Sequence, residues 1–264
     1  MSVSRSNAQL AAFSGIAGRR VIITGGASGM GAGLVVAFSA HGAQVVSLDI
    51  EESVGAAIAS DAGATFVKCD VSEQLSVDGA VTRAVEELGG LDVLIHAAGI
   101  APGASAESTP VDLWRQVLDI NATGTFLTNQ AAFRHMKGSG GRIINFSSAA
   151  GAKGYPGKSA YAASKGAVLA WVRSVAVEWA PFGITVNAIA PAIWTPMYDR
   201  TRASMTEEQL AQHDRDLIGS IPVGGKLGDI DADLVPVLEF LAGDGSRFMT
   251  GQVFAVDGGG LMVR

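Results

Sequence analysis

Cysteine is nearly absent from this chain, since Cys69 is the single one among 264 residues. One cysteine cannot form a disulfide within the chain, and no set of Cys and His residues has the spacing of a zinc site. We therefore expect no metal site and a reducing compartment.

Long apolar runs and basic clusters are missing as well. No stretch approaches the roughly 20 residues of a membrane-spanning helix. The opening segment MSVSRSNAQLAAFSGIAG contains one basic residue, Arg5, and is a poor match to a signal peptide. We expect a short cap or arm there and a cytoplasmic protein. The net charge of −6 argues against nucleic acid or an anionic membrane surface as a partner.

Apolar runs and helical patterns alternate along the whole chain, which is 48% hydrophobic and shows no linker or internal repeat. Strands are expected at residues 20–24, 44–49, 65–69, 91–96, 142–147, 184–189 and 252–256. Helices are expected at 29–41, 52–60, 73–88, 111–136, 160–180 and 230–242. Such alternation predicts a parallel sheet covered on both faces, with its ligand at the carboxyl ends of the strands. We predict one doubly wound α/β domain over residues 1–264, with about seven strands.

The first third of the chain contains a pattern typical of nucleotide binding. A β-branched run ends at Thr24, glycines follow at Gly25, Gly29 and Gly31, and Asp49 ends the second strand. Glycines permit a tight turn and a close approach of the helix N-terminus to a pyrophosphate, and the carboxylate can accept from both ribose hydroxyls. A methyltransferase also uses such a turn and acid, so this class stays open at this point.

Three polar residues further along have the spacing that proton-coupled hydride transfer requires. Tyr161 and Lys165 are four positions apart in an Ala-rich segment, which places them on one face of a helix. An ammonium near a phenol favours the phenolate and brings it towards the range useful for acid–base chemistry. Ser148 ends an apolar strand and can hold a substrate oxygen beside the phenol. A methyltransferase has no use for this set.

Several short motifs occur in a fixed order: TGGASGMG at 24–31, CDVS at 69–72, HAAG at 96–99, INATG at 120–124, Ser148, and YAASK at 161–165. Together they resemble the short-chain dehydrogenase/reductase family. The resemblance covers nearly the whole chain, apart from about the first 15 residues and the segment 194–227. It implies a single-domain Rossmann fold that binds a nicotinamide dinucleotide.

The resemblance also implies catalytic roles. Tyr161 would take the proton of the substrate hydroxyl, while Ser148 would hold the substrate oxygen and stabilise its charge. Lys165 would lower the pKa of Tyr161 and bind the nicotinamide ribose. Asn121 would mark a helix kink and position a water that links Lys165 to solvent. Ser147 is expected to point away from the site because residues alternate along a strand.

The resemblance assigns cofactor contacts to Gly25, Ser28, Gly29, Met30, Gly31, Asp49, Asp70, Val71, His96, Ala97, Gly99, Tyr161, Lys165, Ile193 and Thr195. We predict NAD rather than NADP, because neutral Ser28 and Ile50 stand where family members carry a base for the 2′-phosphate. His96 replaces the usual first asparagine, and a packed imidazole is favoured over an extra base. Pro191 lies one residue closer to Thr195 than in the family pattern, so counting back from Thr195 selects Ile193.

Residues 194–227 are expected to form a substrate lid. Its candidate contacts are Trp194, Met197 and Tyr198, with Tyr155 on the opposite wall and with Ser148 and Tyr161 at the reacting oxygen. An ordinary helical hairpin and a simple turn around Tyr155 are the plainer alternatives. Lys153 and Lys158 are expected to be solvated, so no clamp for a carboxylate is foreseen.

We therefore predict an NAD-dependent alcohol dehydrogenase or ketone reductase acting on a small-to-medium apolar, potentially cyclic, secondary alcohol. An NADPH-dependent carbonyl reductase of the same fold and a catalytically silent NAD-binding protein are the alternatives. A homotetramer is expected, because the helices near 111–136 and 160–180 carry Trp171, Val175 and Trp179 beyond what one sheet face requires.

Overall fold

The sheet of the computed structural model, which describes residues 15–262, is parallel throughout and has the order β3-β2-β1-β4-β5-β6-β7. Most of the expected N-terminal arm lies outside the described residues. The strands are Arg20–Thr24 (β1), Gln44–Asp49 (β2), Thr65–Lys68 (β3), Val93–His96 (β4), Gly141–Phe146 (β5), Ile184–Pro191 (β6) and Val253–Val256 (β7). The predicted doubly wound fold is confirmed, and every expected strand is present within a few residues of its expected bounds.

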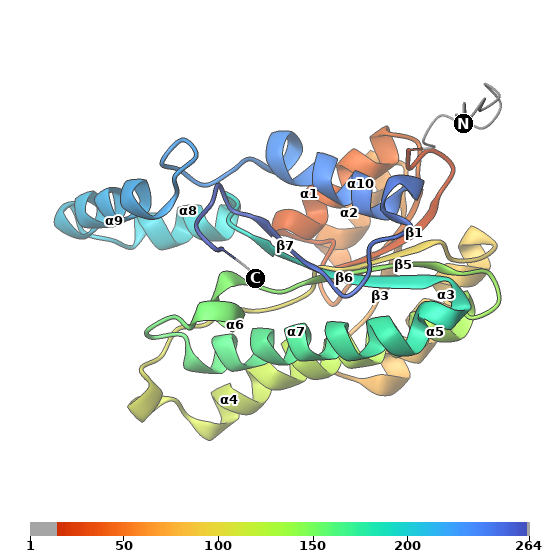
Figure 1. The fold of residues 1–264 in the computed structure, drawn as a ribbon, viewed down its shortest axis with the longest axis horizontal. Helices are drawn as coiled ribbons and strands as arrows, with labels where there is room; N and C mark the ends of the chain where they lie inside the picture. The colour runs from red at the N-terminus through yellow and green to blue at the C-terminus, as the bar shows by residue number, and fades with distance from the viewer. Residues whose placement is uncertain (1–14, 263–264) are drawn as a thin grey trace, which may run out of the picture.

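Helices cover both faces of the sheet (Figure 1). On one face lie α1 (Gly29–Ala40), α2 (Glu52–Ala62) and α10 (Val235–Ala242), and on the other α3 (Gln74–Leu88), α4 (Val111–Leu118), α5 (Gly124–Met136) and α7 (Ser159–Trp179). The side chains of successive strand residues point alternately into the two cores. Ile22 and Leu94 pack on the α3–α5–α7 side of the sheet, while Ile23 and Ile95 pack on the other side. Burial on both faces explains why the strands are continuous apolar runs.

Some local structure differs from the predicted elements. The helix expected at 111–136 contains a wide π-helical turn at Asp119–Thr123, and the helix expected at 230–242 begins with another at Ile230–Leu234. A short helix, α6 (Ala149–Lys153), was not predicted. Short 3-10 turns occur at Ala106–Ser108, Ala180–Phe182 and Asp244–Ser246.

The expected lid is a pair of helices, α8 (Pro196–Ala203) and α9 (Glu207–Ser220), that extends beyond one end of the sheet (Figure 1). α9 begins with a capping box, in which Thr206 and Gln209 bond each other's backbone amides. Two helices are compatible with both a mobile lid and an ordinary hairpin, so the lid stays a prediction.

The structure corrects a further expectation, about residues of α7. Val175 and Trp179 were expected on an outer face, but both are buried in the core of the subunit itself, where Trp179 stacks on Phe133.

Within residues 15–262, no helix combines the length and apolar character needed to cross a bilayer. The same residues contain no group of His, Cys, Asp or Glu side chains placed to hold a metal ion.

Candidate active site

The sequence motifs of the first part of the chain converge where the strand order reverses, at the carboxyl ends of β1 and β4. The glycine turn follows β1, and Ala97–Gly99 follow β4. Gly25 has φ +73°, and a Cβ there would lie 2.9 Å from the Cα of Ala98. The two segments therefore pack backbone against backbone, which only glycine allows. This is the position at which doubly wound folds bind ligands.

The glycine turn leads directly into the N-terminus of α1. A Cβ on Gly31 would lie 2.1 Å from the carbonyl oxygen of Gly25, so the helix starts tightly against the turn. Ser28 is the N-cap residue, but its side chain makes no capping hydrogen bond. The first amides of α1, at Gly29 and Met30 among others, therefore point towards a place where an anion can sit.

Asp49 lies beside this turn and is held by two backbone amides. Its Oδ2 accepts from Ala27 N at 2.9 Å, and its Oδ1 accepts from Glu51 N at 3.0 Å. Lys68 is its partner in the register of β2 and β3, but the Lys68 ammonium pairs with Glu52 at 3.3 Å. The surroundings of Asp49 are thus acidic.

Asp70 and Val71 follow β3 on the same edge of the sheet. Asp70 Oδ1 accepts from the amide and the hydroxyl of Ser72, at 2.9 and 2.6 Å, which fixes the carboxylate in the turn. Val71 is buried, and a Cβ on Gly124 would lie 3.0 Å from its side chain. Both residues therefore lie at the rim where the resemblance places an adenine ring.

His96 is a packed residue, as the sequence favoured. Its Nδ1 lies 3.0 Å from the hydroxyls of both Thr24 and Thr128, and its buried Nε2 has no hydrogen-bond partner among the described residues. Burial, with a smaller contribution from the charge of Lys165, lowers the pKa of His96 to about 3. The imidazole is therefore neutral across the physiological range. Thr24 in turn accepts from the amide of Ala98, so this contact shapes the segment after β4.

Asn121 lies in the π-helical turn and holds the chain that follows Gly99. Its Oδ1 accepts from Ile100 N at 2.8 Å, and its Nδ2 donates to Ile100 O at 2.8 Å and to Ser164 Oγ at 3.0 Å. The helix is irregular at the predicted place, in the form of this π-helical turn. The backbone of Ile100 is a contact that the sequence did not reveal, and the water-positioning role of Asn121 stays a prediction.

Ser148, Tyr161 and Lys165 meet at the carboxyl end of β5. Ser148 is the N-cap of α6 and accepts from Ala150 N at 3.1 Å, while α7 carries Tyr161 and Lys165. The Lys165 ammonium lies 5.8 Å from the centre of the Tyr161 ring and donates to the carbonyl of Phe146 at 2.7 Å. Ser147 instead donates to the carbonyl of Lys165, which distinguishes it from Ser148.

Burial dominates the charge states of this group. It raises the pKa of Tyr161, and the hydrogen bond with Ser148, rather than a contact with Lys165, opposes that rise. Burial also lowers the pKa of Lys165 to about 8. This set is suited to proton transfer, because it combines the buried phenol of Tyr161, the hydroxyl of Ser148 and the Lys165 ammonium, which loses its proton readily.

The loop after β6 carries the next predicted residues. Ile193 and Thr195 are both buried, and Trp194 N donates to the carbonyl of Gly228 at 2.8 Å. Trp194 and Tyr198 pack edge to face, with ring centres 4.8 Å apart. The Met197 side chain lies outside the described parts of the structure.

Polar contacts join α8 to α9 within the lid. Trp194 donates to Asp199 at 2.7 Å, the Tyr198 hydroxyl lies 2.6 Å from His213 Nε2, and Arg202 pairs with Asp214. The Arg202 guanidinium also lies 5.2 Å from the centre of the Trp194 ring. The predicted substrate contacts Trp194 and Tyr198 thus belong to a cluster that fixes the lid's own shape.

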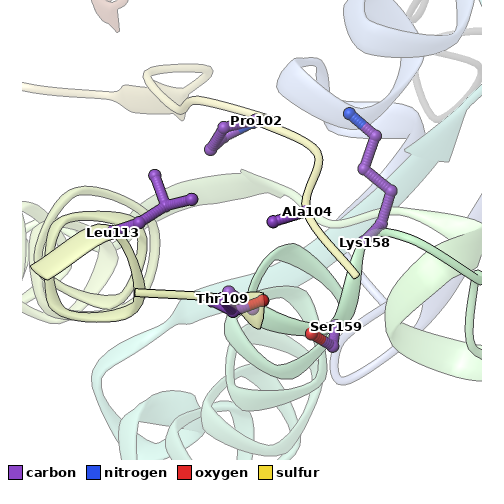
Figure 2. Close-up of a pocket in the computed structure, with 7 residues that line it drawn as sticks. Pro102, Ala104, Thr109, Leu113, Lys158 and Ser159 are labelled. Carbon is purple, nitrogen blue, oxygen red and sulfur yellow. The ribbon is translucent and has the colours of Figure 1, made fainter. Parts of the chain in front are cut away.

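The loop before α7 corrects one expectation. Lys158 was expected in solvent, but it is half-buried and donates to the carbonyl of Ala101 at 2.5 Å. Figure 2 shows it at the start of α7, alongside the loop that carries Pro102 and Ala104. Lys153 donates to the carbonyl of Gly260, and Tyr155 is exposed. The backbone partners of both lysines lie far away in the sequence, which is why their positions could not be foreseen.

The residues present fit a nicotinamide dinucleotide. The glycine turn leaves no room for side chains at Gly25 and Gly31, the start of α1 has no side-chain cap, and Asp49 is fixed beside it. Gly99 brings the chain after β4 close to the reacting group, since a Cβ there would lie 3.4 Å from Lys165 Nζ. The glycine turn, Asp49 and Gly99 follow or end strands β1, β2 and β4, at the same edge of the sheet as the reacting residues.

Comparison with known proteins agrees with this geometry. A family model described as Enoyl-(Acyl carrier protein) reductase matches residues 25–260. The chain is 37% identical over 257 residues to trans-4-hydroxycyclohexanecarboxylate dehydrogenase of Sinomonas cyclohexanicum, covering 92% of this chain and 93% of that protein. It is 35% identical over 246 residues to L-fucose dehydrogenase of Bos taurus, covering 92% and 89%.

A solved structure resembles the fold closely. This protein of Sinorhizobium meliloti, assigned provisionally as a short-chain alcohol dehydrogenase, superimposes with a TM-score of 0.85 at 30% sequence identity. The match covers 93% of this chain and 97% of that one.

Proposed function

The chain belongs to the short-chain dehydrogenase/reductase family, whose dehydrogenases use a nicotinamide cofactor, and on this premise we propose an NAD-dependent oxidoreductase that interconverts a secondary alcohol and a ketone. The observation that carries the proposal is that Ser148, Tyr161 and Lys165 meet at the same edge of the sheet as the glycine turn and Asp49. A silent NAD-binding protein has no need to keep this set together.

The reaction follows from these groups. When bound, the nicotinamide supplies the hydride acceptor for alcohol oxidation. Ser148 donates a hydrogen bond to the substrate oxygen, and Tyr161 takes the hydroxyl proton as the carbon loses hydride. Lys165 has three N–H donors and uses one on Phe146, so the others can stabilise the phenolate and hold the ribose.

The acidic surroundings of Asp49 support NAD over NADP. Glu51 and Glu52 follow Asp49, and the nearby cation, Lys68, is already paired with Glu52. A 2′-phosphate would face the carboxylate of Asp49, and among the described residues the cation opposite Asp49 in the sheet is already paired. We expect kcat/KM to be at least about 10-fold higher with NAD⁺ than with NADP⁺, and Asp49→Ala to narrow this gap. Equal or better use of NADP⁺ would indicate the NADPH-dependent carbonyl reductase instead.

The substrate we propose is a small-to-medium secondary alcohol or ketone with an apolar body, a ring being one option. The relative from Sinomonas cyclohexanicum is named for a ring that carries an alcohol and a carboxylate, and the ring and the alcohol support this choice. A panel of linear, cyclic and sugar alcohols with NAD⁺, followed by absorbance of the reduced cofactor, tests the proposal. No turnover of any alcohol, or of any ketone in the reverse direction, would contradict it. A cytoplasmic location stays a prediction from the sequence.

A further inference from the structure

Lys158 is a partly desolvated cation at the start of the helix that carries Tyr161 and Lys165. It is the N-cap residue of α7, three residues before Tyr161 and about 10 Å along the helix axis from Lys165. Burial alone lowers the pKa of Lys158, and no carboxylate of the described residues offsets that loss of hydration. Its bond to Ala101 uses one of its three N–H donors.

One short segment connects this lysine to the reaction site. Gly99 faces Lys165, Ile100 is held on both sides by Asn121, and Ala101 accepts from Lys158. The bridge between Ala104 and Lys158, with the bond from Ala104 N to Gly157 O at 3.0 Å, holds the loop against the start of α7. The ammonium is therefore fixed at one edge of the site and does not move freely in solvent.

The surroundings of Lys158 are mostly apolar. It borders a small hollow whose other lining residues are Pro102, Ala104, Thr109, Leu113, Ser159 and Ala160 (Figure 2). None of these side chains is acidic. A cation beside apolar walls favours a ligand that carries one negative charge on an apolar body.

We propose that Lys158 binds a carboxylate of the substrate, at the end of an apolar ring opposite to the hydroxyl group that Ser148 and Tyr161 receive. The inference rests on the proposed function, since it concerns the second anchor of the same site. It replaces the expectation of a substrate without charge. Lys158 sets specificity and takes no part in proton transfer.

The test compares a ring alcohol with and without its charge. Initial rates with NAD⁺ are measured for trans-4-hydroxycyclohexanecarboxylate and for its carboxamide, with the native chain and with Lys158→Met. We expect the native chain to prefer the carboxylate by about 10- to 100-fold in kcat/KM. Lys158→Met should lose that preference mainly through a higher KM for the carboxylate, with the carboxamide changed by less than about 3-fold. Lys158→Arg keeps the charge and should retain part of the preference.

Lys153→Met is the matched control, because Lys153 lies just before the same loop and its ammonium bonds only the carbonyl of Gly260. This variant should turn over both substrates with the same kcat/KM as the native chain. Inhibition by cyclohexanecarboxylate, which has no hydroxyl, gives a readout independent of turnover, and its inhibition constant should rise in Lys158→Met by the same factor.

The outcomes distinguish a failure of the Lys158 proposal from a failure of the proposed alcohol dehydrogenase activity. Equal use of carboxylate and carboxamide by the native chain, or an unchanged ratio in Lys158→Met, overturns the role of Lys158 and leaves the alcohol dehydrogenase proposal standing. A chain that oxidises neither compound, nor any uncharged alcohol, overturns both.

Discussion

At the scale of single residues, burial moves the pKa values of Tyr161 and Lys165 in opposite directions and favours the neutral form of each. Formation of the Tyr161 phenolate therefore requires two stabilising contacts. One is the hydrogen bond with Ser148, and the other is the Lys165 ammonium at a distance from the Tyr161 ring centre shorter than the present 5.8 Å. The site is consequently one in which a small shift of Lys165 changes the basicity of Tyr161.

Tyr161→Phe removes the proton-transfer group and leaves the shape of the site intact. We expect kcat to fall by at least about 100-fold, which is the usual contribution of a general base. Binding of NADH, followed by its fluorescence, should change by less than about 3-fold, since the variant keeps the ring. Lys165→Ala, in contrast, should weaken both. Substantial turnover by Tyr161→Phe would contradict the assigned proton acceptor.

The low pKa of buried His96 predicts that the free energy of unfolding falls in acid. Its pKa is about 3 in the folded chain and near 6.5 when unfolded, so the unfolded state takes up a proton that the folded state refuses. The penalty is absent above pH 6.5, grows as the pH falls towards 3, and reaches about 2 kcal/mol at pH 5. The loss in unfolding free energy between pH 7.5 and pH 5, measured by urea denaturation, should be smaller in His96→Asn by about that amount. An equal loss in both chains would show that His96 is protonated without cost.

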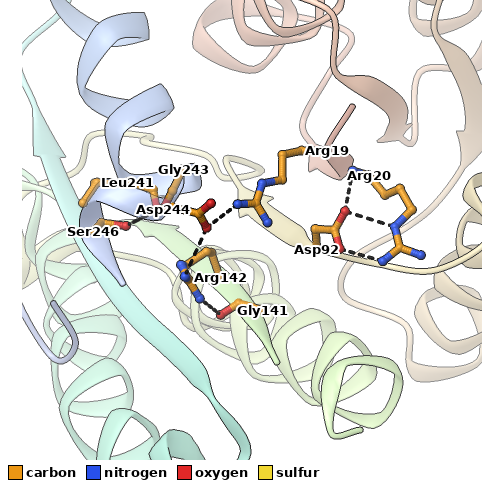
Figure 3. A network of polar contacts seen from close by, with 9 residues as sticks. All are labelled: Arg19, Arg20, Asp92, Gly141, Arg142, Leu241, Gly243, Asp244 and Ser246. Atoms are coloured by element: carbon orange, nitrogen blue, oxygen red, sulfur yellow. Dashed lines mark hydrogen bonds and ion pairs between the residues drawn. The ribbon is translucent and has the colours of Figure 1, made fainter. Parts of the chain in front are cut away.

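At the scale of elements, an Arg–Asp contact ties the start of β1 to the start of β4 (Figure 3). Asp92 accepts from the backbone and the Nε of Arg20, at 2.9 and 3.0 Å, and from its Nη2 at 2.6 Å. Figure 3 shows beside it a second contact, in which Asp244 pairs with Arg19 and Arg142. These ion pairs lie at the amino ends of the strands, away from the residues at the carboxyl ends.

Asp92→Asn should lower the free energy of unfolding at pH 7 by about 1–3 kcal/mol, because it leaves Arg20 with weaker partners in a half-buried position. Asp112→Asn is the control, since its pairing with Arg115 is almost fully exposed, and it should cost less than about 0.5 kcal/mol. Arg20 lowers the pKa of Asp92, so the stabilisation is present above the unfolded pKa and is lost as the pH falls through the folded one. Equal losses in the two variants, measured by denaturation at matched concentration, would contradict this.

The same scale shows what the sequence could and could not predict. Strands were predictable because runs such as Val21–Thr24 are apolar on both faces, and the site could be located because its motifs end those strands. α6 has five residues, too few for a helical period to show. The π-helical turn at Asn121 and the burial of Lys158 depend on Ile100 and Ala101, which are far away in the chain. Contacts of that kind are made by the tertiary fold and leave no local signal.

At the scale of the whole molecule, the outer side of α7 and the edge of the sheet at β7 are among the surfaces that a single subunit leaves uncovered. The outer side of α7 carries small exposed residues at helical spacing, Ala163, Ala167 and Ala170, and continues to the exposed Val177. At the other end of the sheet, β7 is an edge strand. Small residues let helices approach closely, and an open strand edge is commonly covered in the native state.

Pairing of each of these two surfaces with its own copy would build a closed assembly with dyad symmetry. We therefore expect a homotetramer, with a mass by light scattering of four times the 27.0 kDa chain. Ala170→Arg places a large cation on the α7 stripe and should leave a species of half that mass, because only the second surface still pairs. Ala57→Arg is the matched control, since Ala57 is also an exposed helical alanine, on α2, and it should leave the mass unchanged. A monomeric native chain, or an Ala170→Arg variant with the native mass, would show that the α7 face meets solvent instead of a second subunit.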